Sequence, residues 1–445
     1  MPDSVNGPAA TKVRFRFWRP LIAAIALLTV AGAATGWWWA SMSNTAVPGA
    51  VHDLESPLAI AWTVDYPSVT GYEGNQSHTA IGEDAVMIIW EYDDESFAYE
   101  DRAEPPELPI PAALIDLTDG STVWSVDLST LVPDLDPLWS VRAVDVGEKV
   151  IALVASDERE NAGINPSESD LLITVDAKTG ALVEFVEIGQ PLVMMVADPV
   201  SGLIAVETRG ITVYDTAALS EGSVWSVTDG GLFDVGEGFL WTLGGKLFRM
   251  ADGTAPDWAP QTDGQTYGAA DGVIVVSGNY GTSAPISAFA TDNGTRLWTK
   301  PATDANVTVD ASATYIASGA MSDDNEDGYT TVTKLDTLSG KELWTAGGQG
   351  LFSGESTAHD TSSVWSVDGD WEILSPSGES VSVTAGANTL TTGSANIYMD
   401  FDGALHTIDP GTGASVGEMP LGDKSIRSFG SFLVLQDSGA LYGLR

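Results

Sequence analysis

A short pattern that returns along the chain constrains its fold more than any other feature of the sequence. An Asp, a Gly and a Trp stand four residues apart in two stretches, DLTDGSTVW and LDTLSGKELW, and a third stretch keeps only the Gly and the Trp. The residues are Asp116, Gly120 and Trp124, then Asp336, Gly340 and Trp344, and finally Gly294 and Trp298. The comparable turn glycines, at positions 120, 180, 222, 253, 294, 340, 378 and 413, are 31 to 60 residues apart. This spacing indicates one structural unit that is repeated along the chain.

Each residue type of the pattern has a physical reason to stand in a hairpin between strands. Gly supplies the positive φ that a tight turn needs. The Asp carboxylate can accept hydrogen bonds from backbone N–H groups of the same turn. Trp is large and flat and carries one N–H, so it can wedge between neighbouring sheets and donate to a neighbour's backbone. The pattern therefore predicts a turn followed by a strand whose Trp packs on the next unit.

Beyond residue 57, short apolar runs replace any helical periodicity. They are AVMIIW (85–90), VIALVA (150–155), LIAVET (203–208), GVIVVSG (272–278) and SFLVLQ (431–436). Runs of this length, rich in β-branched residues and bounded by Gly, Asp and Ser, are typical of strands that are buried on both faces. A period of about 40 residues with four strands per unit predicts an all-β β-propeller, with blades that cover each other's faces.

The two ends of this region predict how the ring closes. The C-terminal ALYGLR (440–445) is a strand with no turn or Trp strand after it, and IAWTVD (60–65) resembles a Trp strand with nothing before it. Joined, the N- and C-terminal strands complete one blade and remove two exposed edges. We count eight internal units besides this split one and expect one of them to be irregular or absorbed. We therefore expect eight blades, with seven and nine as alternatives.

The repeat V-x-x-L-D-x-x-x-G-x-x-x-W resembles that of the pyrroloquinoline-quinone-dehydrogenase-like (PQQ-like) β-propellers, whose Trp positions dock neighbouring blades. The likeness extends over residues 58–445 but is degenerate, since Glu184 and Gly417 occupy Trp positions and Ala290 an Asp position. The resemblance implies either an envelope scaffold or a quinoprotein dehydrogenase. The dehydrogenases bind the quinone with a calcium ion, and several have a disulfide of adjacent Cys. This chain contains no Cys and no long catalytic inserts, so we do not expect PQQ.

Charge excludes one class of partner. The net charge is −43, and residues 41–445 hold 61 acidic side chains against 15 basic ones. Such a surface repels phosphates, so we expect no nucleic acid as a partner. The Ala-, Asp- and Thr-rich, Lys-poor composition is typical of an actinobacterium, with a halophile as the alternative.

The N-terminal segment predicts a membrane anchor. Residues 20–40 carry no charge over 21 residues, enough for a helix to cross a hydrocarbon core of about 30 Å. Lys12, Arg14, Arg16 and Arg19 precede it and keep the N-terminus cytoplasmic by the positive-inside bias. The alternative is a cleaved signal peptide. In either case the propeller is expected outside the cytoplasm.

The expected domain organisation has four parts. Residues 1–19 are a basic cytoplasmic tail, 20–40 a transmembrane helix, 41–57 a polar linker containing Pro and Gly, and 58–445 the propeller.

Three acidic inserts, at 91–109, 156–170 and 321–330, interrupt equivalent positions of the repeat, between the apolar strand and the strand with the turn. They should emerge on one face of the ring, either as a docking rim for a basic partner or as solvated loops.

The third insert contains Asp323, Asn325 and Asp327 followed by Gly328, which matches the start of a calcium loop. Thr331 and Lys334 stand at its ninth and twelfth positions, however, and an EF-hand requires Glu at the twelfth. Calcium and a solvated hairpin both remain open as interpretations.

No catalytic constellation is visible in the sequence. The four histidines, His52, His78, His359 and His406, have no metal-ligand spacing, and no P-loop, dinucleotide or nucleophile-elbow motif occurs on a suitable background. The chain is therefore expected to be a non-catalytic, membrane-tethered scaffold for an envelope or extracellular protein. An extracellular hydrolase or sugar-binding propeller is the alternative, and a quinoprotein dehydrogenase is a third reading.

Overall fold

The computed structural model separates the chain into two units, residues 1–44 and 45–445. The residues described are 51–55, 57–70, 76–90, 109–132, 140–147, 149–156, 170–188, 190, 192–199, 201–228, 231–259, 266–277, 285–301, 305–309, 313–318, 329–350, 363–367, 370–374, 380–385, 389–392, 396–409 and 411–445. The predicted anchor at 20–40 lies outside them. None of the helices in these ranges has the length and apolar run that a bilayer crossing requires.

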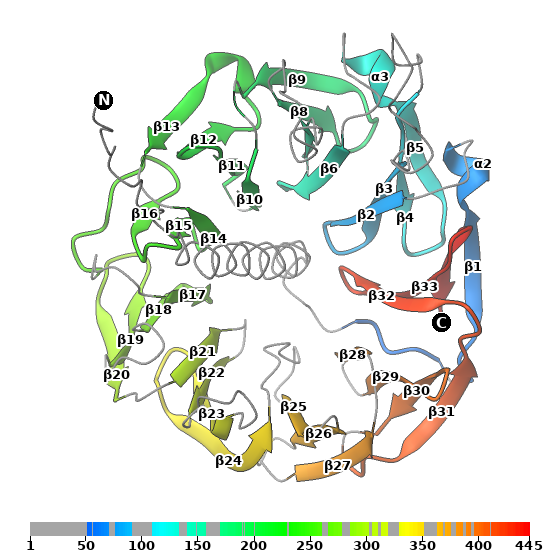
Figure 1. Ribbon diagram of the computed structural model, residues 1–445, viewed down its shortest axis with the longest axis vertical. Coiled ribbons are helices and arrows are strands. Elements are labelled where there is room, and N and C mark those ends of the chain that lie inside the picture. The colour runs from blue at the N-terminus through cyan, green and yellow to red at the C-terminus, as the bar shows by residue number, and fades with distance from the viewer. Residues whose placement is uncertain are drawn as a thin grey trace, which may run out of the picture. The chain divides into compact units, whose positions relative to one another are not determined.

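The described strands form nine antiparallel sheets, seven of four strands and two of three (Figure 1). The first is built from β2 (Gln76–Ile81), β3 (Ala85–Trp90), β4 (Pro111–Asp116) and β5 (Thr122–Asp127). The next two are β6 (Ser140–Asp145), β7 (Val150–Ser156), β8 (Leu171–Asp176) and β9 (Leu182–Glu187), then β10 (Met194–Asp198), β11 (Leu203–Glu207), β12 (Ile211–Asp215) and β13 (Ser223–Val227).

Three further sheets continue the order along the chain. They are β14 (Leu232–Gly236), β15 (Phe239–Thr242) and β16 (Leu247–Arg249); β17 (Thr266–Ala270), β18 (Val273–Ser277), β19 (Ile286–Ala290) and β20 (Arg296–Lys300); and β21 (Ala305–Val309), β22 (Ala313–Ser318), β23 (Tyr329–Asp336) and β24 (Glu342–Gly350).

The chain ends with two more sheets and one that joins its two ends. They are β25 (Ser363–Val367), β26 (Asp370–Leu374) and β27 (Ser380–Ala385); β28 (Thr389–Thr392), β29 (Ile397–Phe401), β30 (Ala404–Ile408) and β31 (Ser415–Pro420); and β32 (Ser425–Phe429), β33 (Phe432–Gln436), β34 (Ala440–Leu444) and β1 (Ile60–Asp65). We call this last one the joining sheet, because β1 pairs antiparallel with β34. Three short helices interrupt the connections: α2 (Tyr66–Thr70), α3 (Leu128–Leu131) and the 3-10 helix η3 (Leu219–Glu221).

The sheets follow one another around a centre, as the blades of a β-propeller do (Figure 1). Their hydrophobic clusters lie between consecutive sheets. One contains Met87 and Leu114 with Leu153 and Ile173 of the following sheet, and another contains Ile204 with Val154 of the preceding one. The second strands whose burial is described, such as β3, β11 and β15, are buried almost throughout, and all five residues of β18 are buried. The prediction that the apolar runs are strands covered on both faces is confirmed.

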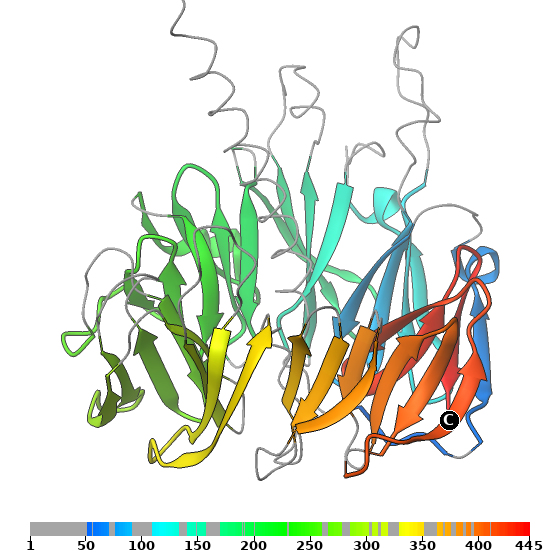
Figure 2. The same ribbon diagram turned by 60° about the horizontal axis from the view of Figure 1, so that its bottom comes forward.

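The strand plan also gives the unit two distinct faces. In an antiparallel sheet successive connections alternate between the two ends of the strands. We call the face with the first-to-second and third-to-fourth connections the turn face, for example residues 82–84 and 337–341. The opposite face, with the second-to-third connections such as 208–210, 243–246 and 437–439, is the loop face. Figure 2 shows the strands running between these two faces.

Two sequence-based expectations concern the blades and the linker. We expected eight four-stranded blades, with seven and nine as alternatives, and the described residues form nine sheets, two of them with three strands. The sheet β14–β16 has three strands because residues 254–259, which follow the turn at Gly253, form no strand. In addition, residues 51–55 were assigned to the polar linker, whereas Val51 is buried against the sheets.

Candidate functional site

The predicted calcium ligands lie outside the described residues. Asp323, Asn325 and Asp327 belong to the insert between β22 and β23, where the structure describes nothing from 319 to 328. Within the described part of the chain, no group of three or more His, Asp or Glu side chains is arranged to hold a metal ion. Calcium at 323–327 therefore stays a prediction.

The three acidic inserts are attached at one end of their sheets. They connect β3 to β4, β7 to β8 and β22 to β23, which are second-to-third connections in every case. All three therefore begin and end on the loop face. Equivalent connections elsewhere are short, as at 208–210 between β11 and β12, so this face varies most in the length of its connections.

Four Trp residues each join their own sheet to the turn of the next. The indole Nε1 of Trp124 in β5 donates to the carbonyl of Ala177, beside the turn that leads into β9, at 3.0 Å. Trp298 in β20 donates in the same way to Thr337 at 2.7 Å. Two residues outside the full pattern repeat the contact, since Trp62 donates to Leu117 at 3.1 Å and Trp225 to Met250 at 2.7 Å.

The turns that receive these indoles have the geometry that their residue types allow. Gly120 and Gly340 have φ of 74° and 63°. A Cβ on Gly120 would lie 2.8 Å from the ring of Trp62, so the indole occupies the space that a side chain would need. Asp116 accepts from the amide of Thr118 at 2.7 Å, and Asp336 from that of Ser339 at 2.7 Å. The hydrogen bonds from Ser339 hold the pKa of the Asp336 carboxyl below its usual value, against a smaller effect of burial.

Departures from the Trp pattern have two different structural consequences. Glu184 in β9 stands at a Trp position and reaches η3 of the following sheet, where it accepts from the Ser220 amide at 2.7 Å and from the Ser220 hydroxyl at 3.1 Å. A carboxylate therefore makes the contact that an indole makes elsewhere. Gly417 in β31 has no side chain to extend toward the joining sheet.

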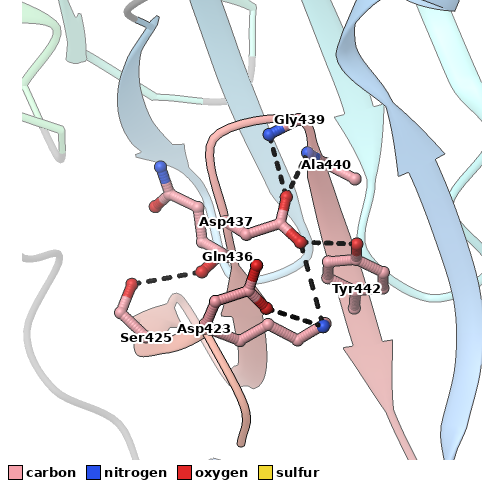
Figure 3. A network of polar contacts seen from close by, with 8 residues as sticks. Asp423, Ser425, Gln436, Asp437, Gly439, Ala440 and Tyr442 are labelled. Atoms are coloured by element: carbon pink, nitrogen blue, oxygen red, sulfur yellow. Dashed lines mark hydrogen bonds and ion pairs between the residues drawn. The ribbon is translucent and has the colours of Figure 1, made fainter.

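The joining sheet carries a polar network that sequence reasoning missed (Figure 3). Asp437, in the turn between β33 and β34, accepts from the amides of Gly439 and Ala440 at 2.8 Å each and from the Tyr442 hydroxyl at 2.7 Å. The Lys424 ammonium lies 3.9 Å from Asp437 and 4.8 Å from the centre of the Tyr442 ring. No sequence motif predicts this network, because Lys424 lies before β32, Asp437 in a turn and Tyr442 in β34.

The charge states in this network follow from its hydrogen bonds. Burial alone would raise the pKa of Asp437, but the bonds from Tyr442, Gly439 and Ala440 and the Lys424 charge hold it below its usual value. The bond to Asp437, followed by burial and by nearby carboxylates, raises the pKa of Tyr442 to about 12. The network is thus a fixed anionic turn with a cation beside it, on the loop face.

A second cluster lies where the joining sheet meets the sheet β2–β5. The Tyr66 hydroxyl and the His78 Nε2 are 3.0 Å apart, and the His78 ring stacks on Phe429 with centroids 6.0 Å apart. Burial, followed by the charge of Arg427 in β32, lowers the pKa of His78 to about 4, against a backbone hydrogen bond at Gln76. Burial and the nearby Asp437 raise the pKa of Tyr66. His78 is therefore neutral at physiological pH and serves packing and hydrogen bonding.

Two other carboxyl groups with raised pKa values lie in neighbouring sheets. Burial raises the pKa of Asp234 in β14 to about 6, although it accepts from the Val235 amide at 2.8 Å. Burial likewise raises the pKa of Glu207, which accepts from the Leu232 amide at 2.7 Å. Glu207 thereby joins the loop end of β11 to the start of β14.

The most exposed large apolar side chains of the described residues lie beside this contact. Val193 is 69% exposed and Leu243 is 65% exposed. The Val193 amide donates to the Glu207 carbonyl at 2.8 Å, and the Leu243 amide to the Gly231 carbonyl at 2.8 Å. Val193 precedes β10 and Leu243 follows β15, so both lie on the loop face, on sheets whose connections there are short.

Comparison with known proteins supplies similarities of shape alone. No protein-family model and no curated protein matches the chain. Among solved structures, BamB from Moraxella catarrhalis is 15% identical with a TM-score of 0.39 and covers 88% of this chain and 98% of its own. AztD from Citrobacter koseri is 10% identical with a TM-score of 0.35, and the match covers 76% of this chain and 95% of AztD. The Neurospora crassa Pan2 WD40 domain is 11% identical with a TM-score of 0.37, and the match covers 88% of this chain and 97% of that domain. At such values these likenesses carry no argument about the function of this chain.

Proposed function

We propose that the chain is a membrane-tethered, extracytoplasmic β-propeller of nine blades in a closed ring, which binds a protein partner as a non-catalytic scaffold. Each sheet is taken as one blade, and the pairing of β1 with β34 as the closure. The apolar segment 20–40 and the basic residues before it support the tether and its orientation.

One observation carries the assignment of the binding face. The chain enters the sheets on the turn face, where the His52 amide donates to the carbonyl of Ser431, in the turn between β32 and β33, at 2.7 Å. The connections that vary in length and the exposed Val193 and Leu243 are on the opposite, loop face. Variable connections on a rigid scaffold are where proteins place their binding surfaces. We infer that the partner docks on the loop face.

The chemistry of the partner follows from charge. Residues 41–445 carry 61 acidic and 15 basic side chains, so a partner with a basic surface gains attraction over the whole approach. Exposed apolar side chains such as Leu243 supply contact area once it arrives. The proposed partner is therefore an envelope or extracellular protein with a basic surface.

The chain offers a matched pair of positions for the test. Leu243 and Leu338 are both exposed leucines in turns, 65% and 58% exposed, on the loop face and the turn face respectively. A photo-reactive amino acid at each position, in the full chain in its native membrane, is irradiated at low and at high salt. We expect a discrete protein adduct from position 243 that weakens at high salt, and none from 338. Equal adducts from both positions, or none from 243, would overturn the assignment.

A further inference from the structure

The junction between the sheet β28–β31 and the joining sheet lacks the device that holds other junctions. β31 has Gly417 where β5, β13 and β20 have a Trp. The joining sheet in turn has no hairpin to receive an indole, because its third and fourth strands, β34 and β1, come from opposite ends of the unit. In place of a hairpin turn, the Arg445 amide donates to the Ala59 carbonyl at 3.0 Å and the Ala59 amide donates to the Arg445 carbonyl at 3.4 Å.

Residues 51–55 and 57–58, which we call the strap, pack into this junction. Val51 is only 3% exposed, and Leu54 and Leu58 are half-buried. They share one hydrophobic cluster with side chains of both sheets, including Tyr398 and Leu405 of one and Ile426 and Leu444 of the other. This junction has no Trp, and the aliphatic side chains of the strap fill it instead.

Polar contacts attach the strap to each of the two sheets. The Leu54 amide donates to the Tyr398 hydroxyl at 2.7 Å, and the Asn396 amide donates to Asp53 at 3.2 Å, both toward the sheet β28–β31. On the other side, the His52 amide donates to Ser431 at 2.7 Å and the His52 ring packs edge-on against Phe432 of β33 at 4.9 Å. Every residue from 51 to 54 thus contacts one or both sheets.

We propose that the strap is the latch of this junction: it takes the place of the missing Trp and turn, and the junction opens before the others when the strap is released. At Trp298 the joining contact is built into the two sheets themselves. Here it comes from the segment that precedes β1, which is held by a few hydrogen bonds and three aliphatic side chains. Because the strap is continuous with the N-terminal segment, a pull on that segment reaches this junction first. The proposal does not depend on the tether or on the partner.

Hydrogen exchange of the full chain tests the latch strand by strand. Val51→Asn removes a buried strap side chain, and Val416→Asn is its control, because Val416 lies in β31 but is 57% exposed. We expect Val51→Asn to speed exchange in β29, β32 and β33 by about tenfold and to leave β11 and β18 unchanged. The control should leave all of them unchanged.

A milder variant keeps the test decisive if Val51→Asn fails to fold. Tyr398→Phe removes only the hydroxyl that accepts from Leu54 and retains the ring. A smaller, about threefold rise confined to the same strands supports the latch. Exchange that rises equally in all sheets, or that does not rise beside the strap in either variant, would overturn it.

Discussion

A single glycine decides whether an indole can seat between two sheets. At Gly340 the backbone has φ of 63°, and a Cβ would collide with the ring of Trp298. Gly82 has the same φ of 63° but nothing within 4 Å of the position of a Cβ. A side chain at either position would adopt the same unfavourable positive φ, but only at Gly340 would it also collide with an indole.

We expect Gly340→Ala to destabilise the protein by about 1–3 kcal/mol more than Gly82→Ala. In both variants the left-handed Ala lowers the free energy of unfolding by roughly 1–2 kcal/mol, and only Gly340→Ala must also displace an indole. Urea unfolding of both variants measures the difference. Equal losses would show that the Trp298 ring is not seated against this turn.

His78 gives the stability a pH dependence with a definite sign. Its pKa is about 4 in the folded chain, lowered mainly by burial and then by Arg427, against an unfolded value of about 6.5. Between these values the unfolded chain binds a proton that the folded chain does not. Stability from this group is therefore complete above pH 6.5 and is lost as the pH falls toward 4.

The variant His78→Gln should flatten that dependence. We expect wild type to lose about 2 kcal/mol relative to His78→Gln between pH 6.5 and pH 4, because the variant has no imidazole to protonate. Chemical denaturation across this range measures the difference. A wild-type curve parallel to that of His78→Gln would contradict a half-buried histidine that is neutral in the folded chain.

At the scale of elements, the contact between a fourth strand and the next sheet tolerates different chemistry. In β9 the contact is the Glu184 carboxylate on Ser220 of η3 rather than an indole on a turn carbonyl. Glu187, three residues further along the same strand, is exposed and can serve as a control.

We expect Glu184→Ala to cost about 1 kcal/mol and to speed hydrogen exchange at the Ser220 amide, since that amide loses its acceptor. Glu187→Ala should leave both quantities unchanged. Exchange at single-amide resolution together with urea unfolding makes the measurement. The same exchange rate at Ser220 in both variants would show that Glu184 does not join the sheets.

The elements also show which parts of the fold the sequence could predict. The run at 85–90 is apolar without interruption, so a buried strand was the one physical solution, and β3 spans the same residues. Glu184 could be recognised as a departure from the Trp pattern, but its partner could not, because η3 is far along the chain. Residues 51–55 belong to the predicted linker because residues 41–57 are polar, contain Pro and Gly and show no strand periodicity. The junction beside Gly417 explains why Val51 is buried and Leu54 half-buried.

The candidate site was predictable in part for the same reason. Strand alternation places all three acidic inserts on one face, which needs no side-chain information. The network of Asp437, Tyr442 and Lys424 depends on a turn geometry and on a linker that pass close together only in the folded chain. Val193 and Leu243 are unremarkable apolar residues in sequence, and their exposure follows from the short connections around them.

At the scale of the whole molecule, the unit 45–445 has two faces with different roles in the proposed function. The chain enters through the strap on the turn face, and the acidic inserts attach on the loop face. The proposed function requires the loop face to be accessible outside the cytoplasm.

Labelling of single cysteines in intact cells tests that requirement most directly, because the chain has no Cys of its own. Leu243→Cys places a thiol on the loop face, and Thr11→Cys places one in the predicted cytoplasmic tail. The proposed function predicts that a membrane-impermeant maleimide labels Leu243→Cys before lysis and Thr11→Cys only after it, with both variants in the membrane fraction. Labelling of Leu243→Cys only after lysis would contradict an extracytoplasmic scaffold.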